Sequence, residues 1–117
     1  MDKKKDKLKI KEPNEIDKSY LAGLVDGEGS FYIDGRDKVW KFSIGMSDKG
    51  PIEKIKEAFG LDNLTISERD DNRSRKFSKM YSIKVAKQQT KQIALHLLPY
   101  LIAKKNTAIK VICDLVN

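Results

Sequence analysis

Two carboxylates stand among glycines at the end of an apolar segment, and they are the residues of this sequence best suited to chemistry. Residues 21–29 read Leu-Ala-Gly-Leu-Val-Asp-Gly-Glu-Gly, and a strand-like segment follows at once. Hard divalent cations such as Mg²⁺ prefer carboxylate oxygens as ligands. The pattern therefore predicts an apolar helix of small residues whose acidic tip, Asp26 and Glu28, is suited to holding a divalent metal.

Composition excludes several other kinds of reactive site. Cys113 is the only cysteine and His96 the only histidine, and both have apolar neighbours along the chain. Each is interpreted as a structural residue. Zinc sites built from cysteine and histidine, Cys–His nucleophilic pairs and intrachain disulfides are therefore excluded. Any bound metal is expected to be held by oxygen.

The charge balance favours a polyanionic partner. The chain has 117 residues, which bounds it to one domain, and 24 lysines and arginines against 17 acids give a net charge of +7. A soluble, lysine-rich surface is the plainer interpretation of that charge. The sequence has no apolar run long enough to span a membrane and no signal peptide. We expect a soluble intracellular protein, in a bacterial or phage cytoplasm or in an organelle.

The order of elements predicts an α+β fold. Residues 1–12 alternate lysine with other residues and are expected to form a basic, flexible N-terminal arm before a single domain over 13–117. Helical and alternating patterns then give the order α-β-β-α-β-β-α-α. Expected strands cover residues 30–36, 39–47, 64–69 and 77–85; expected helices cover 13–27, 48–60, 88–98 and 100–116. The two hairpins form one antiparallel sheet with helices on one face.

The other face of this sheet is expected to remain open. The alternation places on it a set of polar and basic residues: Tyr32, Asp34, Arg36, Lys41, Ser43, Thr65, Ser67, Arg69, Ser82 and Lys84. Strands with such a face can read base edges in the DNA major groove. An ordinary solvated sheet face is the alternative that spacing alone leaves open.

Residues 21–29, followed by Ser30-Phe31, resemble the LAGLIDADG motif of homing endonucleases. The predicted order of elements matches the αββαββα core of that family over most of the chain. Residues 98–105, Leu-Pro-Tyr-Leu-Ile-Ala-Lys-Lys, resemble its second landmark, a Pro-aromatic-Leu step before a basic helix. The resemblance implies a saddle-shaped, four-stranded sheet whose open face binds double-stranded DNA.

A single motif per chain implies a homodimer. Gly23 and Gly27 are four residues apart and share one helix face, so two motif helices can approach closely. The expected interface consists of Tyr20, Gly23, Asp26 and Gly27, with Asp26 capping a helix of the partner subunit. The two Glu28 carboxylates would crowd together and repel unless a cation neutralised them.

The resemblance further implies a site-specific, metal-dependent enzyme that cuts both strands of a long pseudo-palindromic target, encoded by a mobile intron or intein. Glu28 is then the catalytic metal ligand, assisted by the Gly27 carbonyl, with Asp26 as the other acid of the site. Mg²⁺ is the expected ion, with Mn²⁺ substituting. Lys104 matches the catalytic basic residue. Further DNA contacts are expected from Lys105, Arg73 and Arg75.

One position departs from the family pattern. A polar residue, commonly Gln, often lies near the end of the second strand and orients the attacking water, but Met46 falls there. Either Ser47 or Asp48 replaces it, or solvent and phosphate order the water, or cleavage has been lost. Two other functions therefore stay open: an intron RNA maturase on the same fold, and a DNA-binding regulator without cleavage.

Overall fold

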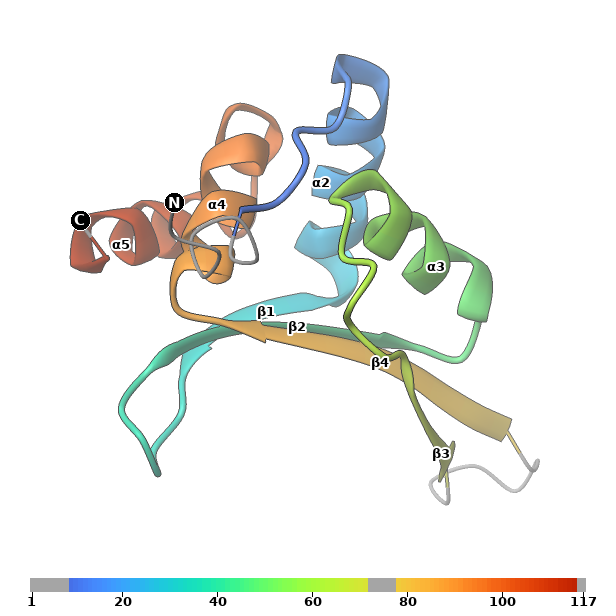
Figure 1. Ribbon diagram of the computed structural model, residues 1–117. Helices are drawn as coiled ribbons and strands as arrows, with labels where there is room; N and C mark the ends of the chain where they lie inside the picture. Colours follow the sequence, from blue (N-terminus) through green and yellow to red (C-terminus); the bar gives the residue numbers. More distant parts are fainter. Residues whose placement is uncertain (1–8, 72–77, 116–117) are drawn as a thin grey trace, which may run out of the picture.

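The computed structural model describes residues 9–71 and 78–115 and confirms the predicted α+β fold. The elements, in chain order, are α2 (Glu15–Glu28), β1 (Gly29–Ile33), β2 (Trp40–Met46), α3 (Lys49–Ala58), β3 (Ser67–Asp71), β4 (Ser78–Ala86), α4 (Gln88–Leu97), the 3₁₀ turn η1 (Leu98–Tyr100) and α5 (Lys105–Asp114). All strand pairs are antiparallel, in the order β1-β2-β4-β3. The helices lie together above one face of the sheet (Figure 1).

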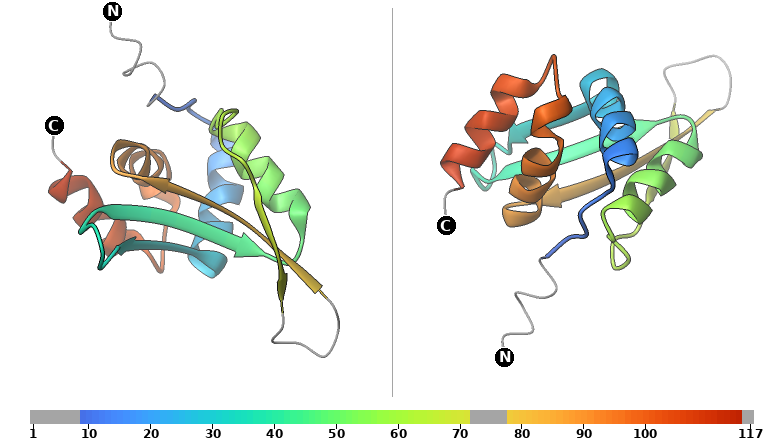
Figure 2. Two further views of the ribbon diagram at one scale, coloured as in Figure 1. Left: turned by 60° about the horizontal axis from the view of Figure 1, so that its bottom comes forward. Right: turned by 90° about the horizontal axis from the view of Figure 1, so that it is seen from above.

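The sheet is arched, and its ends bend away from the helices (Figure 1). On the covered face, helices α5, α4, α2 and α3 follow one another across the sheet (Figure 2). Helix α2 runs down onto the sheet and continues directly into β1. This arrangement leaves a concave face without helices and places the acidic tip of α2 at the level of the strands.

The junction between α2 and β1 depends on a glycine. Asn14 begins the helix, because its side chain accepts a hydrogen bond from the Asp17 N–H at 2.8 Å. At the other end, a Cβ added to Gly29 would lie 3.0 Å from Val25 Cγ1 and 3.1 Å from the Phe42 ring. A side chain at this position would crowd Val25 and Phe42, so glycine suits the turn from helix into strand against the core.

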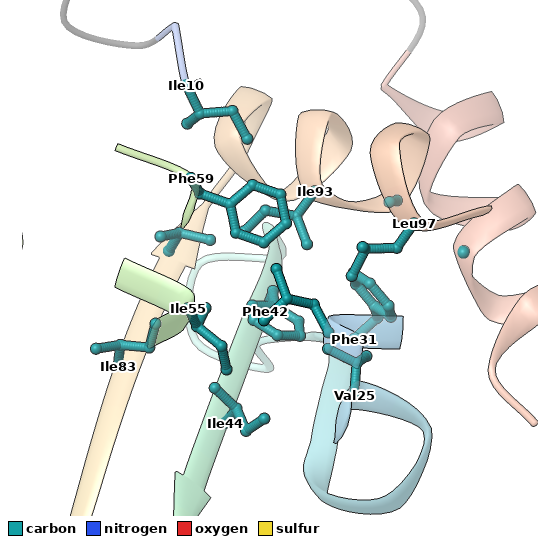
Figure 3. Packing of buried hydrophobic residues seen from close by; sticks show 14 of the residues in the cluster. Ile10, Val25, Phe31, Phe42, Ile44, Ile55, Phe59, Ile83, Ile93 and Leu97 are labelled. Atoms are coloured by element: carbon teal, nitrogen blue, oxygen red, sulfur yellow. The ribbon is translucent and has the colours of Figure 1, made fainter. Parts of the chain in front are cut away.

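The core lies between the sheet and the four helices (Figure 3). Phe31 and Phe42, from neighbouring strands, pack with ring centroids 5.0 Å apart. The largest fully buried apolar side chains come from β2, from all four helices and from the residues that follow α3 and η1: Phe42, Ile44, Leu21, Val25, Ile52, Ile55, Phe59, Ile93, Leu97, Leu101 and Val111. The buried strand Trp40–Met46 is also tied to α5, because the Trp40 indole N–H donates to Asp114 Oδ2 at 2.8 Å.

The segment just before α2 packs on the domain, although residues 1–12 were expected to form a flexible arm. Ile10 is only 7% exposed and lies beside Phe59 in the core. The Lys11 N–H donates to the Phe59 carbonyl at 2.8 Å, and the Ile10 N–H donates to the Gln92 side chain at 2.9 Å. Residues 1–8 lie outside the described residues, so the expectation of an arm applies to them alone.

Several strand and helix faces differ from the sequence prediction. Ile33 shares the inward side of the alternation with Phe31, but it is 47% exposed as the last residue of β1. Helix α5 begins at Lys105 rather than at residue 100, and its buried residues are Ala108 and Val111, whereas Ile109 is 42% exposed. Strand β3 begins at Ser67, three residues later than predicted. The alternation over residues 77–85 and the helical spacing over 100–116 also predict Phe77 and Val116 in the core, but both lie outside the described residues.

Candidate functional site

The concave face carries a hollow of about 610 Å³ at its centre. Seven of the residues predicted for the open face line it together: Tyr32, Ser43, Thr65, Ser67, Arg69, Ser82 and Lys84. Gly45 and Met80 also line the hollow. They belong to the outward set of the alternation, but the sequence prediction did not include them because neither carries a polar side chain.

Two cations stand at this hollow without an ion-pair partner among the described residues. Lys84 on β4 pairs in register with Ser43, and Arg69 on β3 pairs with Met80. Both are exposed. Ser82 and its partner Ser67 lie between the two cations, and Ser43 lies on the far side of Lys84 on the same face. This is a mixed donor and acceptor surface of the kind that reads base edges.

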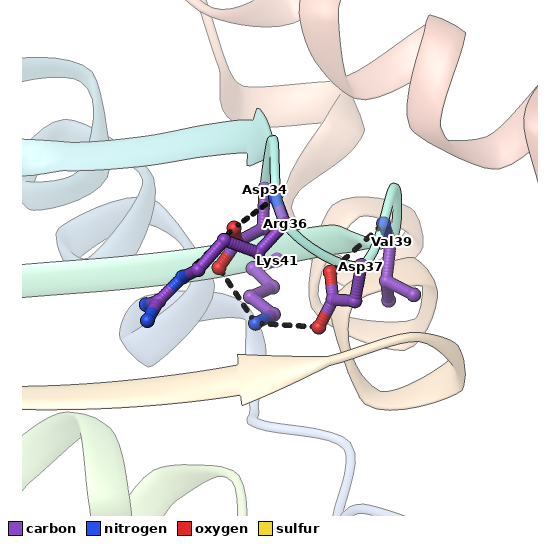
Figure 4. A network of polar contacts seen from close by, with 5 residues as sticks. All are labelled: Asp34, Arg36, Asp37, Val39 and Lys41. Atoms are coloured by element: carbon purple, nitrogen blue, oxygen red, sulfur yellow. Dashed lines mark hydrogen bonds and ion pairs between the residues drawn. The ribbon is translucent and has the colours of Figure 1, made fainter.

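The β1–β2 end of the open face is neutralised internally (Figure 4). The Lys41 ammonium lies 2.8 Å from Asp34 Oδ2 and 3.0 Å from Asp37 Oδ2. Asp34 also accepts the Arg36 N–H at 2.9 Å. The hydrogen bond from Lys41, followed by that from Arg36, lowers the pKa of Asp34 to about 2. Both carboxylates therefore stay ionised around Lys41.

The predicted DNA contacts at this end differ in availability. Lys41 is held by two carboxylates, whereas the Arg36 side chain is 92% exposed and lies 3.8 Å from Asp34. The contact between Asp37 and Lys41 was not predicted from the sequence, because it depends on how the turn between β1 and β2 folds. Among the other predicted contacts, Lys105 is the exposed first residue of α5, and Arg73 and Arg75 lie outside the described residues.

The tip of α2 presents a free carboxylate. Glu28 is exposed and has no hydrogen-bond or ion-pair partner in the described part of the chain, and Gly27 beside it is exposed as well. No three His, Cys, Asp or Glu residues gather within residues 9–71 and 78–115 in a way that could hold a metal. One chain thus supplies one free carboxylate and a neighbouring carbonyl, which are hard donors but too few for a closed site.

Asp26, the other acid of the motif, is engaged inside its own chain. Its carboxylate accepts the Ile102 N–H at 2.8 Å and the Lys104 N–H at 3.0 Å. The Lys104 ammonium in turn donates to the Asp26 carbonyl at 2.8 Å. Burial opposes ionisation of Asp26, but the backbone N–H groups of Ile102, Lys104 and Ala103 outweigh it and hold its pKa below the usual value.

One side of α2 is not covered by any element within residues 9–71 and 78–115. Ile16 is 81% and Tyr20 48% exposed, and a Cβ added to Gly23 or Gly27 would meet no atom of these residues within 4 Å. The four residues share one helix face by their spacing. They form a smooth strip of two apolar side chains and two glycines, which we call the α2 strip.

Met46 ends β2 and packs partly buried against the core, so its thioether is not a polar group on the open face. Ser47 and Asp48 follow and are exposed. The Asp48 side chain accepts the Gly50 N–H at 3.1 Å and so begins α3. Ser47 and Asp48 were the two predicted replacements for a water-orienting residue. Within the described chain, the Asp48 side chain is engaged as a helix cap, whereas the Ser47 side chain makes no such hydrogen bond.

None of the helices in the described residues has the length and hydropathy that a membrane-spanning segment requires.

Comparisons with known proteins agree with this architecture. The sequence model of the LAGLIDADG endonuclease matches residues 21–116. Among curated protein sequences, none matches the chain significantly. Two similar solved structures are of the homing endonuclease I-CvuI, each with a TM-score of 0.61. One, 18% identical, is in complex with an I-CreI target in 2 mM Mg with the DNA not cleaved. The other, 22% identical, is with its own target in 2 mM Ca.

The matched regions cover 85% and 86% of this chain but only 65% and 68% of the two I-CvuI chains. This chain therefore spans about two thirds of the length of these structures. At such identities, the likeness demonstrates a shared fold.

Proposed function

This chain belongs to the LAGLIDADG endonuclease family, and from that premise we propose that it is a site-specific endonuclease that cleaves both strands of DNA. The observation that carries the proposal is the position of Glu28. A free carboxylate stands at the tip of α2, where that helix meets the sheet whose other face is open and concave. DNA lying along the open face would bring its backbone to this tip.

The open face is suited to duplex DNA by chemistry and by shape. Its hollow offers hydroxyl groups together with the unpaired cations Arg69 and Lys84. Hydroxyl groups and cations can contact both phosphates and the base edges of the major groove. The net charge of +7 adds attraction for a polyanion that does not depend on sequence.

The proposed active form is a homodimer joined through the α2 strip. Close contact between two such helices is possible because Gly23 and Gly27 present no side chain and no described residue of the same chain lies within 4 Å of their Cβ positions. A two-fold axis along the strip would bring the Glu28 of one protomer beside the partner's tip. It would also cover Ile16 and Tyr20, which are exposed in the single chain.

Within this dimer, Glu28 and the Gly27 carbonyl would hold a divalent ion together with the DNA phosphate. Their oxygen donors fit Mg²⁺ and Mn²⁺. Such an ion, when bound, supplies Lewis-acid polarisation of water and phosphate. The chain's own contribution is to place the Lys104 ammonium beside the end of α2. There it can stabilise negative charge on a phosphate during hydrolysis.

Cleavage of a randomised supercoiled plasmid library tests the proposal. With Mg²⁺, the protein should produce discrete double-strand cuts with short 3′ overhangs at related sequences. Glu28→Gln should abolish cutting and retain target binding. Glu57→Gln, an exposed acid on α3, serves as the matched control and should cut normally. Equal cutting by Glu28→Gln and wild type would refute the assigned site. Preference for a structured RNA transcript over DNA would favour a maturase.

Sedimentation equilibrium tests the assembly separately. A dimer should form through the α2 strip, with or without DNA. A protein that stays monomeric on a DNA target that it cuts on both strands would contradict the homodimer.

A further inference from the structure

The start of α5 has no cap of its own. Lys104, the residue before the helix, makes no capping bond with its side chain. Backbone N–H groups at a helix start need acceptors from elsewhere when the capping residue supplies none. Asp26 supplies one from 78 residues earlier in the chain, and its carboxylate lies among the N–H groups of residues 102–104. Such a concave set of backbone N–H groups binds anions well.

The return bond completes the other helix. Helix α2 ends at Glu28, so the Asp26 carbonyl is one of the last four carbonyls, which have no partner within the helix. The Lys104 ammonium donates to this carbonyl. A cation at a helix C-terminus is electrostatically favourable. The same two residues thus cap both helices reciprocally, although they belong to opposite ends of the domain.

This reciprocal contact restricts a side chain that is otherwise flexible. Lysine loses much rotamer freedom when its ammonium is fixed, and a fixed turn at 102–104 defines where the side chain begins. The bonded carbonyl precedes Gly27 and Glu28 directly in the sequence. Both Asp26 oxygens already accept backbone hydrogen bonds. The geometry therefore suits Asp26 to orienting Lys104 rather than to binding metal.

We propose that Asp26 is a positioning residue whose carboxylate fixes the 102–104 turn and thereby holds the Lys104 ammonium at the tip of α2 beside Glu28. This inference rests on the proposed endonuclease function. Asp26 affects the rate of strand cleavage only through Lys104 and contributes little to DNA binding. Each protomer orients its own lysine, so this contact does not need the partner subunit.

A double-mutant cycle tests the inference. Single-turnover cleavage at saturating target, and target affinity in Ca²⁺, are measured for wild type, Asp26→Asn, Lys104→Met and the double variant. Asp26→Asn should slow cleavage by roughly 10- to 100-fold, the scale of a misplaced catalytic group, with affinity nearly unchanged. In the Lys104→Met background it should add no further loss. The proposal would be overturned if the rate losses of Asp26→Asn and Lys104→Met multiplied in the double variant. It would also be overturned if Asp26→Asn lowered cleavage rate and target affinity equally.

Two further variants keep the test decisive. Asp26→Glu keeps the charge but displaces the carboxylate by one methylene, so it should fold normally and still slow cleavage. Asp114→Asn removes another carboxylate that joins two elements, through Trp40 rather than Lys104, and should leave the rate unchanged. A rate loss in Asp114→Asn as large as that in Asp26→Asn would indicate a merely structural effect.

A readout without DNA separates this inference from the proposed function. Amide hydrogen exchange at Ile102 and Lys104, and the ¹⁵N resonance of the Lys104 ammonium, report the reciprocal contact directly. Asp26→Asn should speed the amide exchange and move the ¹⁵N chemical shift of the Lys104 ammonium toward that of a free lysine. If wild type cuts no DNA but this change occurs, the endonuclease proposal fails and the positioning role stands. Unchanged exchange and resonance would overturn the positioning role.

Discussion

At the scale of single residues, the open face combines free cations with cations that are already neutralised. Lys84 and Arg69 are available to a ligand, whereas Lys41 lies between Asp34 and Asp37. Contact of Lys41 with DNA would therefore require it to share or leave these carboxylates. Residue type and alternation placed these side chains on one face, but only the folded hairpin shows which of them are engaged.

Asp34→Asn tests this network through the pH dependence of stability. The pKa of Asp34 is lowered to about 2 in the folded protein, so its stabilising contribution is complete above the unfolded pKa of about 3.9. It is lost as the pH falls from about 4 through about 2. Urea unfolding between pH 2 and 5 should show a smaller fall in stability for Asp34→Asn than for wild type.

The comparison variant is Asp62→Asn, an exposed acid outside this network, which should follow the wild-type pH profile. Parallel profiles for Asp34→Asn and wild type would show that the Lys41 contact does not stabilise the fold.

At the scale of elements, α2 has two faces of opposite character. Leu21, Ala22 and Val25 are fully buried, while the α2 strip on the other side is largely exposed in the described chain. Glycine inside a helix costs roughly 1 kcal/mol relative to alanine. Two glycines on one exposed face therefore reduce the stability of the isolated chain, a cost that the proposed dimer contact would offset.

Gly23→Ala should thus stabilise the monomer and weaken the dimer. In the monomer, at low concentration, it should raise the free energy of unfolding by roughly 0.5–1 kcal/mol. In the dimer, overpacking should cost about 1–3 kcal/mol and weaken association by roughly 5- to 150-fold. Sedimentation equilibrium and urea unfolding measure the two effects.

Gly50→Ala in α3 is the matched control, because its added Cβ would meet only Asp48 Oδ1 at an ordinary 3.5 Å. It should leave dimerisation unchanged. Unweakened association of Gly23→Ala would argue against the α2 strip as the interface.

The segment before α2 is a second element whose role follows from burial. Ile10 is 7% and Ile102 86% exposed. Ile10→Ala should lower the free energy of unfolding by roughly 2–4 kcal/mol, because it leaves a cavity beside Phe59. Ile102→Ala should change it by less than about 0.5 kcal/mol. Equal effects in urea unfolding would show that the strap formed by residues 9–12 does not contribute to the core.

At the scale of the whole molecule, the sequence was sufficient for the fold class and for the order of elements. The 21–29 motif and the alternating strands carry strong local patterns, and the structure contains the helix and the strands that these patterns predict. Burial of Ile10 and exposure of Ile33 were not predictable, because both depend on where the sheet bends and which helix lies above. The Asp26–Lys104 contact joins residues 78 positions apart, a separation that no local pattern reports.

The net charge of +7 makes DNA affinity a property of the whole molecule. If the dimer contacts six or more phosphates, affinity should fall by roughly 10³-fold or more between 50 and 200 mM salt. Fluorescence anisotropy of a labelled target measures this dependence. Lys84→Ala should reduce the salt slope of the dimer by about 1.8, or about 0.9 for each protomer, if Lys84 contacts a phosphate. An unchanged slope with altered sequence preference would assign Lys84 to a base edge.

The indole of Trp40 gives this domain an optical property. It is the only tryptophan in the chain, is 8% exposed and donates its N–H to Asp114 near the end of α5. Indole emission shifts with the polarity of its surroundings, so intrinsic fluorescence should report whether α5 is docked on the sheet. Lys104 directly precedes α5. The emission maximum of Trp40 in an unlabelled sample can therefore report whether the helix that follows this lysine is packed on the sheet.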